Sequence, residues 1–190
     1  MKKKTPKKQL LKKVKELSNQ VTKLLDTAKV KYKVLEHKVV YTAHDVSATT
    51  KNKLGLVAKV VLVKVTGPQP VILSERSESK DLLKSKDYFV LIVLPAGKYV
   101  DFKGIKKALK AKKVSMASEK DITKYLKTKV GLLHPFGSVC NLQTMLDKGV
   151  MKSKKLIASA GTYTHAVELA IKDFEKIVKP IKGSFSKAKR

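Results

Sequence analysis

The chain has 190 residues, enough for one domain of ordinary size with a short appendage. A hydrophobic fraction of 43% excludes a disordered tail, and a single cysteine excludes an intrachain disulfide. The 43 Lys and Arg residues against 15 Asp and Glu give a formal net charge of +28. Such a charge attracts polyanions, so nucleic acid is the first candidate partner and an anionic membrane surface the second. The alternative is a lysine-rich surface that only solvates the protein.

The sequence also predicts a compartment. Cys140 stands alone, which is typical of a reducing environment. The longest apolar run, residues 88–96, is far shorter than the roughly 20 residues of a membrane helix. No apolar segment follows the basic start of the chain, so we expect a soluble, cytoplasmic protein without a signal peptide.

The first predicted element is a basic amphipathic helix within residues 1–29. Apolar residues recur at steps of three and four, which places them on one stripe of a helix over 6–28. This stripe consists of Leu10, Val14, Leu17, Val21, Leu24 and Ala28. Docking on the chain's own domain is the favoured interpretation, and a short coiled coil is the alternative, because the pattern barely covers three heptads.

Strands dominate the next part of the chain. β-branched residues predict a strand over 32–41, a turn over 42–45, and then a helix to about Leu54 capped by Asp45 or Ser47. Further apolar runs predict strands over 57–65, 71–73 and 88–94, with a polar loop over 74–87. The run over 88–94 is nearly all apolar, which indicates burial on both faces.

Helices and strands then alternate. We predict helices over 102–111, 118–128 (capped by Ser118) and 172–178, strands over 113–116, 156–159 and 166–171, and a loop over 131–141. Residues 182–190 are predicted to be a basic, frayed tail. Since several neighbouring strands look hairpin-linked, the expected fold is α+β, with a largely antiparallel curved sheet and packed helices.

Familiar catalytic patterns are absent from the sequence. The four histidines form no zinc-binding spacing, and there is no G-x-S-x-G elbow, P-loop or G-x-G-x-x-G motif. Cys140 could be a nucleophile, but its apolar context favours a buried, inert thiol. We therefore expect neither metal nor cofactor, and an enzyme here would need chemistry that asks little of its side chains.

Six segments stand out in order over about residues 30–180. They are Y-K-V-L-E-H-K-V-V-Y-T-A-H-D (32–45), V-A-K-V-V-L-V-K (57–64), F-V-L-I-V-L-P-A (89–96), V-S-M-A-S-E-K-D-I-T-K-Y-L (114–126), G-L-L-H-P-F-G (131–137) and A-G-T-Y-T-H-A-V-E-L (160–169). The G-x-x-x-P motif and the strand lysine are weak signals alone, but their order among the other segments is specific. Together these segments resemble the YbaK / prolyl-tRNA synthetase-associated editing-domain family.

The resemblance implies a stand-alone deacylase domain over residues 30–181. Its reaction would be hydrolysis of the ester in mischarged tRNA, commonly tRNA(Pro) carrying alanine or cysteine. An aminoacyl ester is activated, so positioning and oxyanion stabilisation can supply most of the acceleration without a nucleophilic side chain. Val60 follows Lys59, where alanine-specific members often carry Asn, so the amino acid stays open.

The resemblance also implies site residues. Lys59 and Gly131 would be catalytic: the lysine would hold the terminal phosphate or otherwise orient the substrate end, and the glycine would bring main-chain N–H groups close to the carbonyl. A solvent-facing lysine is the alternative for Lys59, and ordinary packing or turn roles are alternatives for the others. The predicted substrate-binding residues are His37, Tyr41, Thr42, Pro135, Phe136, Gly161 and Thr164.

Lysines on one face of the helix over 102–111 would bind the tRNA backbone without reading its sequence. They are Lys103, Lys106, Lys107 and Lys110. A synthetase or an elongation factor is a further candidate partner, whereas no membrane partner is expected. Two rival functions remain at this point: a non-catalytic tRNA- or RNA-binding protein of the same fold, and a protein that binds anionic lipid through its basic helix.

Overall fold

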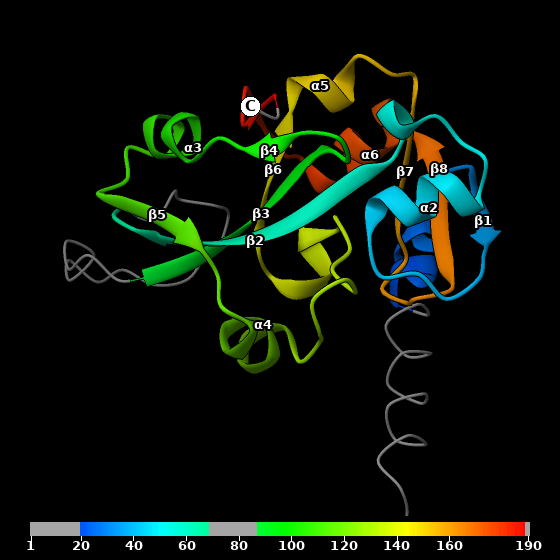
Figure 1. The fold of residues 1–190 in the computed structure, drawn as a ribbon, viewed down its shortest axis with the longest axis horizontal. Coiled ribbons are helices and arrows are strands. Elements are labelled where there is room, and N and C mark those ends of the chain that lie inside the picture. Colours follow the sequence, from blue (N-terminus) through cyan, green and yellow to red (C-terminus); the bar gives the residue numbers. More distant parts are fainter. Residues whose placement is uncertain (1–19, 69–86, 189–190) are drawn as a thin grey trace, which may run out of the picture.

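A computed structural model describes residues 20–68 and 87–188 of the chain. Its strands form a five-stranded, a three-stranded and a two-stranded sheet (Figure 1). The five-stranded sheet has the order β5 (Lys113–Met116), β2 (Ala58–Thr66), β3 (Asp87–Pro95), β6 (Gln143–Asp147) and β9 (Ile181–Gly183). The three-stranded sheet has the order β1 (Tyr32–Glu36), β8 (His165–Ala170) and β7 (Lys155–Ser159), and β10 (Ser186–Lys187) pairs with β4 (Tyr99–Val100).

The long antiparallel pair of β2 and β3 is the centre of the larger sheet. It runs from Ala58 opposite Pro95 to Thr66 opposite Asp87. On its other side, β2 pairs with β5 only over Val63–Thr66, so no strand of the described residues pairs with the first half of β2 there, which leaves it a free edge. β6 and β9 are added in parallel, which makes the sheet mixed. As predicted, β3 is buried along nearly its whole length.

Two helices cover opposite faces of this sheet (Figure 1). On one face, α3 (Phe102–Ala108) packs Ile105 in a cluster with Val63 and Val65. On the other face, α4 (Glu119–Leu126) packs Ile122 in a cluster with Leu62. Because side chains alternate along a strand, the even-numbered residues of β2 face α4 and the odd-numbered ones face α3.

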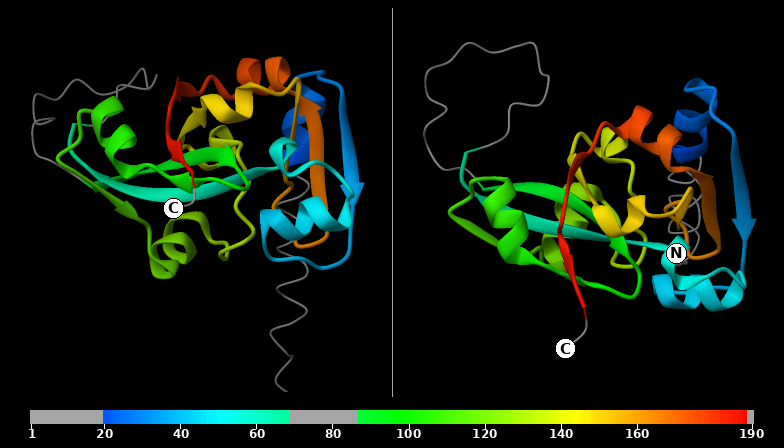
Figure 2. Two further views of the ribbon diagram at one scale, coloured as in Figure 1. Left: turned by 45° about the horizontal axis from the view of Figure 1, so that its top comes forward. Right: turned by 90° about the horizontal axis from the view of Figure 1, so that it is seen from above.

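The three-stranded sheet lies at the end of the β2–β3 pair where β2 begins (Figure 2). α6 (Ile171–Val178) and the helical residues 20–27 pack on it, with Leu25, Leu169 and Phe174 in one core cluster. α2 (Ala43–Thr49) covers the junction of the two sheets and packs with Val57 and Ile157. The remaining helical turns are η1 (Leu54–Leu56), η2 (Gly137–Cys140) and α5 (Lys148–Met151).

Most predicted elements from residue 57 onward are confirmed, and α4 carries the expected capping box of Ser118 and Asp121. The predicted strand over 32–41 is too long, since the chain leaves the sheet after Glu36. The predicted caps Asp45 and Ser47 are wrong: the Thr42 side chain accepts the Asp45 N–H and starts α2. The predicted strand over 71–73 and the first 19 residues of the basic helix lie outside the described residues.

The predicted frayed tail is instead part of the fold as far as residue 188. Phe185 is 1% exposed, and its N–H donates to the buried carboxylate of Asp147 at 2.6 Å. The hydroxyl of Ser186 donates to the same carboxylate at 2.9 Å. A buried carboxylate with several donors fixes the segment that carries β9 and β10. Across residues 20–68 and 87–188, no helix combines the length and apolar character needed to cross a membrane.

Candidate active site

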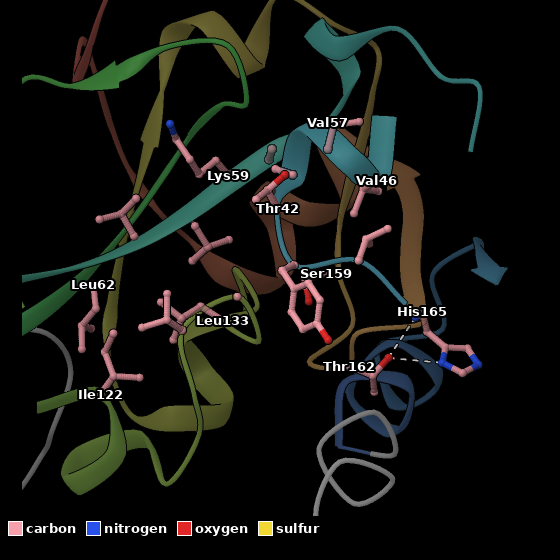
Figure 3. A pocket seen from close by; sticks show the side chains of 18 of the residues that line it. Thr42, Val46, Val57, Lys59, Leu62, Ile122, Leu133, Ser159, Thr162 and His165 are labelled. Carbon is pink, nitrogen blue, oxygen red and sulfur yellow. Dashed lines mark hydrogen bonds between the residues drawn. The ribbon is translucent and has the colours of Figure 1, made fainter. Parts of the chain in front are cut away.

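A cavity of about 460 Å³ lies between the two sheets, at the free edge of β2. It is lined by parts of five segments that are distant in sequence: 37–46, 57–62, 116–122, 130–133 and 159–165. Each of these segments overlaps one that carried the family resemblance. The fold therefore gathers these signals around a single space (Figure 3).

The free edge of β2 presents main-chain groups to this cavity. The carbonyl of Leu62 accepts the N–H of Ala117 at 3.0 Å, which fixes the side on which the even-numbered residues direct their backbone groups. Two residues earlier, the N–H and C=O of Val60 point the same way, but β5 does not extend that far. Val60 therefore offers one donor and one acceptor at the cavity wall.

The cavity has an apolar end and a polar end (Figure 3). Leu62, Ile122 and Leu133 line the end nearest α4. Ser159 and Thr162, together with His37 and His165, line it near β7 and β8. Such a space suits a ligand with an apolar group at one extremity and several hydrogen-bonding groups at the other.

Lys59 lies at the margin of the cavity, with its ammonium directed away from Leu133 (Figure 3). Its Nζ donates to the carbonyl of Lys98 at 2.7 Å and lies 5.3 Å from the ring centroid of Tyr99. Within the described residues no carboxylate pairs with it, and burial lowers the pKa of its ammonium. This cation is partly desolvated and held by one neutral acceptor, so a phosphate oxygen could displace that acceptor.

Gly131 has a backbone conformation that other residues rarely adopt, with φ at +85°. A Cβ atom at this position would lie 2.9 Å from the carbonyl oxygen of Tyr41 and 3.5 Å from the ring of Tyr163. Glycine therefore allows two segments of the cavity wall to approach each other closely. Gly131 and Lys59 line the same cavity, which brings together the two residues predicted to be catalytic.

His37 has one nitrogen free for a ligand. Its Nδ1 lies 2.8 Å from the carbonyl of Lys38, which can only accept, so Nδ1 carries the proton. The other nitrogen, Nε2, is buried and has no hydrogen-bond partner among residues 20–68 and 87–188. Because His37 lines the cavity, its Nε2 is a candidate hydrogen-bond acceptor for the ligand.

Thr162 and His165 form a second polar group that the sequence did not single out as part of the site. Thr162 Oγ1 accepts the N–H groups of Thr164 at 3.3 Å and His165 at 2.9 Å, which occupies both of its lone pairs. A hydroxyl bound in this way is a poor nucleophile. Nδ1 of His165 lies 3.2 Å from this hydroxyl and 2.8 Å from that of Thr164, so the two hydroxyls together orient the His165 ring.

Cys140, which carries the only thiol of the sequence, lies outside the cavity. Burial raises the pKa of its thiol. Its Sγ lies 3.8 Å from Nε2 of His134, a residue only 5% exposed whose pKa is lowered by burial to about 4. Both groups are therefore neutral near pH 7, so the pair supplies no thiolate. The described residues contain no group of three or more His, Cys, Asp or Glu side chains that could hold a metal.

The predicted substrate-binding residues separate into two groups. His37, Tyr41 and Thr42 line the cavity, although the Thr42 hydroxyl also caps α2. Pro135, Phe136, Gly161 and Thr164 do not line it. Phe136 is fully buried in the core instead, with its ring 5.6 Å from that of Phe174.

Three of the predicted tRNA-binding lysines, Lys103, Lys106 and Lys107, lie on α3, which packs on the sheet face opposite α4, and Lys110 follows that helix. None of these four lysines lines the cavity. Sequence reasoning missed Val60 as a backbone donor and the side chains of Leu62, Ile122, Ser159, Thr162 and His165. Of these, only the even-numbered apolar residues of β2 carried a usable signal, namely their alternation with Lys59 and Val61.

Known proteins include relatives of this chain. A family model described as an aminoacyl-tRNA editing domain matches residues 37–177. The prolyl-tRNA editing protein ProX of Acetoanaerobium sticklandii is 24% identical over 165 residues, which cover 85% of this chain and 90% of that protein.

Two crystal structures share the fold. The hypothetical protein APE2540 superposes with a TM-score of 0.72 at 13% identity, covering 88% of this chain and 99% of the other. A protein proposed to be a trans-editing enzyme for prolyl tRNA synthetase superposes with a TM-score of 0.69 at 14% identity, covering 90% and 98%. At these identities, the structural likeness establishes the architecture alone.

Proposed function

Because the chain belongs to the aminoacyl-tRNA editing domain family, we propose that it hydrolyses, in trans, the ester bond of mischarged tRNA. The observation that carries this proposal is the shared cavity of Lys59 and Gly131 at the free edge of β2. An ester carbonyl placed there meets main-chain donors in an apolar, partly water-excluded space. Such donors stabilise the negative charge that develops on the carbonyl oxygen during hydrolysis.

Water is the proposed nucleophile. The only cysteine lies outside the cavity, and the Thr162 oxygen is occupied by two backbone N–H groups. An aminoacyl ester needs little activation, so holding it beside a water molecule supplies much of the rate. The proposed donors to the oxyanion are the N–H of Val60 and the main-chain N–H groups beside Gly131. His37 Nε2 accepts a hydrogen bond from the polar part of the substrate.

Lys59 is proposed to hold the phosphate end of the terminal nucleotide. Its ammonium exchanges the carbonyl of Lys98 for a phosphate oxygen, which forms the stronger charge-assisted hydrogen bond. The flexible stem of a lysine allows this movement without a change in β2. The partial burial that lowers the pKa of this ammonium also strengthens its attraction to an anion.

The preferred substrate is proposed to be tRNA(Pro) that carries a small amino acid such as alanine or cysteine. The printed name of the ProX relative, a prolyl-tRNA editing protein, supports the tRNA. The apolar wall of Leu62, Ile122 and Leu133 supports a side chain without charge. Each methylene in such a pocket changes discrimination by roughly 1–3 kcal/mol, so related amino acids are separated only modestly.

The proposal is tested by deacylation of a panel of mischarged tRNAs. We expect the wild type to release the amino acid and Lys59→Ala to lose at least tenfold in kcat/KM. Lys64→Ala is the matched control, because Lys64 lies on the same strand but pairs with Asp87 at 2.8 Å, outside the cavity. Equal rates in both variants would contradict the assignment of Lys59. Binding of tRNA without hydrolysis of any ester would favour the alternative, a non-catalytic RNA-binding protein.

A further inference from the structure

We propose that the cavity rim between Tyr41 and α4 binds the unpaired 3′ strand that carries the ester, by stacking its bases and neutralising its phosphates. This inference rests on the proposed function and adds a binding surface to it. Three large apolar side chains line the cavity and yet remain exposed: Tyr41 at 65%, Met116 at 56% and Val130 at 53%. Exposed apolar groups that gather around a cavity are typical of a binding surface.

Tyr41 is held as a platform. Its ring meets that of Tyr163 edge-on, with the centroids 4.9 Å apart. The backbone beside it is fixed as well, because the N–H of Val40 donates to the carbonyl of Tyr163 at 3.0 Å. An aromatic ring that is fixed from one side and open on the other can stack on a base of any identity.

Exposed lysines lie on the same stretch of chain as several residues that line the cavity. α4 contributes Glu119 and Ile122 to the lining, and the segment after it contributes Val130 and Gly131. Four exposed lysines lie on this same stretch, and none of them forms an ion pair in the described part of the chain. These rim lysines are Lys120, Lys124, Lys127 and Lys129.

A second exposed aromatic ring lies among the rim lysines. Tyr125 is 54% exposed, and its ring centroid lies 4.5 Å from that of Phe89. The Nζ of Lys124 lies 5.3 Å from the centroid of the Tyr125 ring. Rings interleaved with cations are the arrangement that binds single strands, because unpaired bases stack while phosphates meet positive charge. A duplex has no free base faces for these rings.

Its lysines alone would make α3 the better candidate to bind the 3′ strand, but its position in the fold favours α4. α3 lies on the sheet face opposite α4 and contributes nothing to the cavity. The proposed path of the strand therefore crosses α4 and the segment after it, which contribute to the cavity lining, rather than α3. The lysines in and just after α3 remain predicted contacts for more distant parts of a long tRNA, which makes them a matched control for a short strand.

The test measures, as a function of salt concentration, the binding of a short RNA oligonucleotide with a free 3′ end that carries no amino acid. One variant replaces Lys120, Lys124, Lys127 and Lys129 by Ser. The control variant replaces Lys103, Lys106, Lys107 and Lys110 by Ser, so each lowers the net charge of +28 by four. Since each phosphate contact on a single strand contributes roughly 0.7, we expect the rim variant to flatten the log–log salt slope by about 3 and the control to leave it unchanged.

The stacking is tested on the same oligonucleotide with Tyr41→Ala and Tyr41→Phe. Loss of one stacked base weakens binding by about 5- to 160-fold, and the Phe variant should restore it because its ring is retained. A thermal melt of each variant verifies that it is folded. Equal slopes for the two lysine variants, or wild-type binding by Tyr41→Ala, overturns the proposal.

Because the RNA in this assay carries no amino acid, the outcome is independent of ester hydrolysis. A protein that binds at the rim but cleaves no mischarged tRNA would retain this inference and lose the proposed function. If the protein hydrolyses the ester but both lysine variants have the same salt slope, the proposed function stands and this inference is wrong.

Discussion

Replacing Gly131 by alanine tests whether the close approach at the cavity wall matters. At φ +85° an alanine costs about 1–2 kcal/mol, because its Cβ crowds its own backbone. The new Cβ would also lie 2.9 Å from the Tyr41 carbonyl oxygen, and a backbone atom cannot move away as a flexible side chain could. Together these effects should lower the free energy of unfolding by about 2–4 kcal/mol. For a chain of this size, Tm should fall by roughly 5–12 °C.

The same substitution should reduce kcat/KM for mischarged tRNA by about tenfold, because a displacement of several tenths of an ångström misplaces the ester. Gly55→Ala is the control: a Cβ there meets no atom within 4 Å, and its effect on Tm and rate should be small. Deacylation rates and thermal melts of both variants check the prediction. If Gly131→Ala melts and turns over like the wild type, the reasoning about this wall is refuted.

Three other perturbations have defined outcomes. His134 has a folded pKa of about 4, below its unfolded value of about 6.5, so the unfolded chain binds more protons between these values. Stability should fall by about 2 kcal/mol from pH 7.5 to 5 in urea titrations, and His134→Gln should remove that difference. His37→Gln, whose amide oxygen replaces the Nε2 acceptor, should keep more deacylase activity than His37→Ala; identical losses would contradict the acceptor role. Asp147→Ala should lower the urea unfolding free energy by about 3 kcal/mol, because the Phe185 N–H loses its buried acceptor.

The parts of the fold that were predictable from sequence are those with local signals. The β2–β3 pair follows from two long apolar runs, and α4 follows from its capping box. β6 was missed because Gln143–Asp147 is short and has no alternating pattern. The strand over 32–41 was predicted too long because propensity does not reveal where a partner strand ends. In fact β8 pairs only as far as Glu36.

The site was only partly predictable for a similar reason. Lys59 and Gly131 could be found from motifs, but the cavity between them depends on contacts between distant segments. The free nitrogen of His37 follows from a bond to the Lys38 carbonyl, which no sequence pattern encodes. Phe136 is part of a matched motif, yet it packs in the core, since a motif does not separate residues that support a loop from residues that touch a ligand.

The register of β2 against β3 determines on which face of the sheet the side chain of Lys59 lies. Lys59 stands opposite Leu94, and its neighbour Val60 stands opposite Val93. A slip of one position would exchange the two, sending the ammonium under α4 among leucines and an isoleucine. The apolar cross-strand pairs farther along β2 and β3 fix this register, and they therefore also fix the position of the Lys59 ammonium. A substitution far along these two strands is therefore expected to displace Lys59 without touching any residue that lines the cavity.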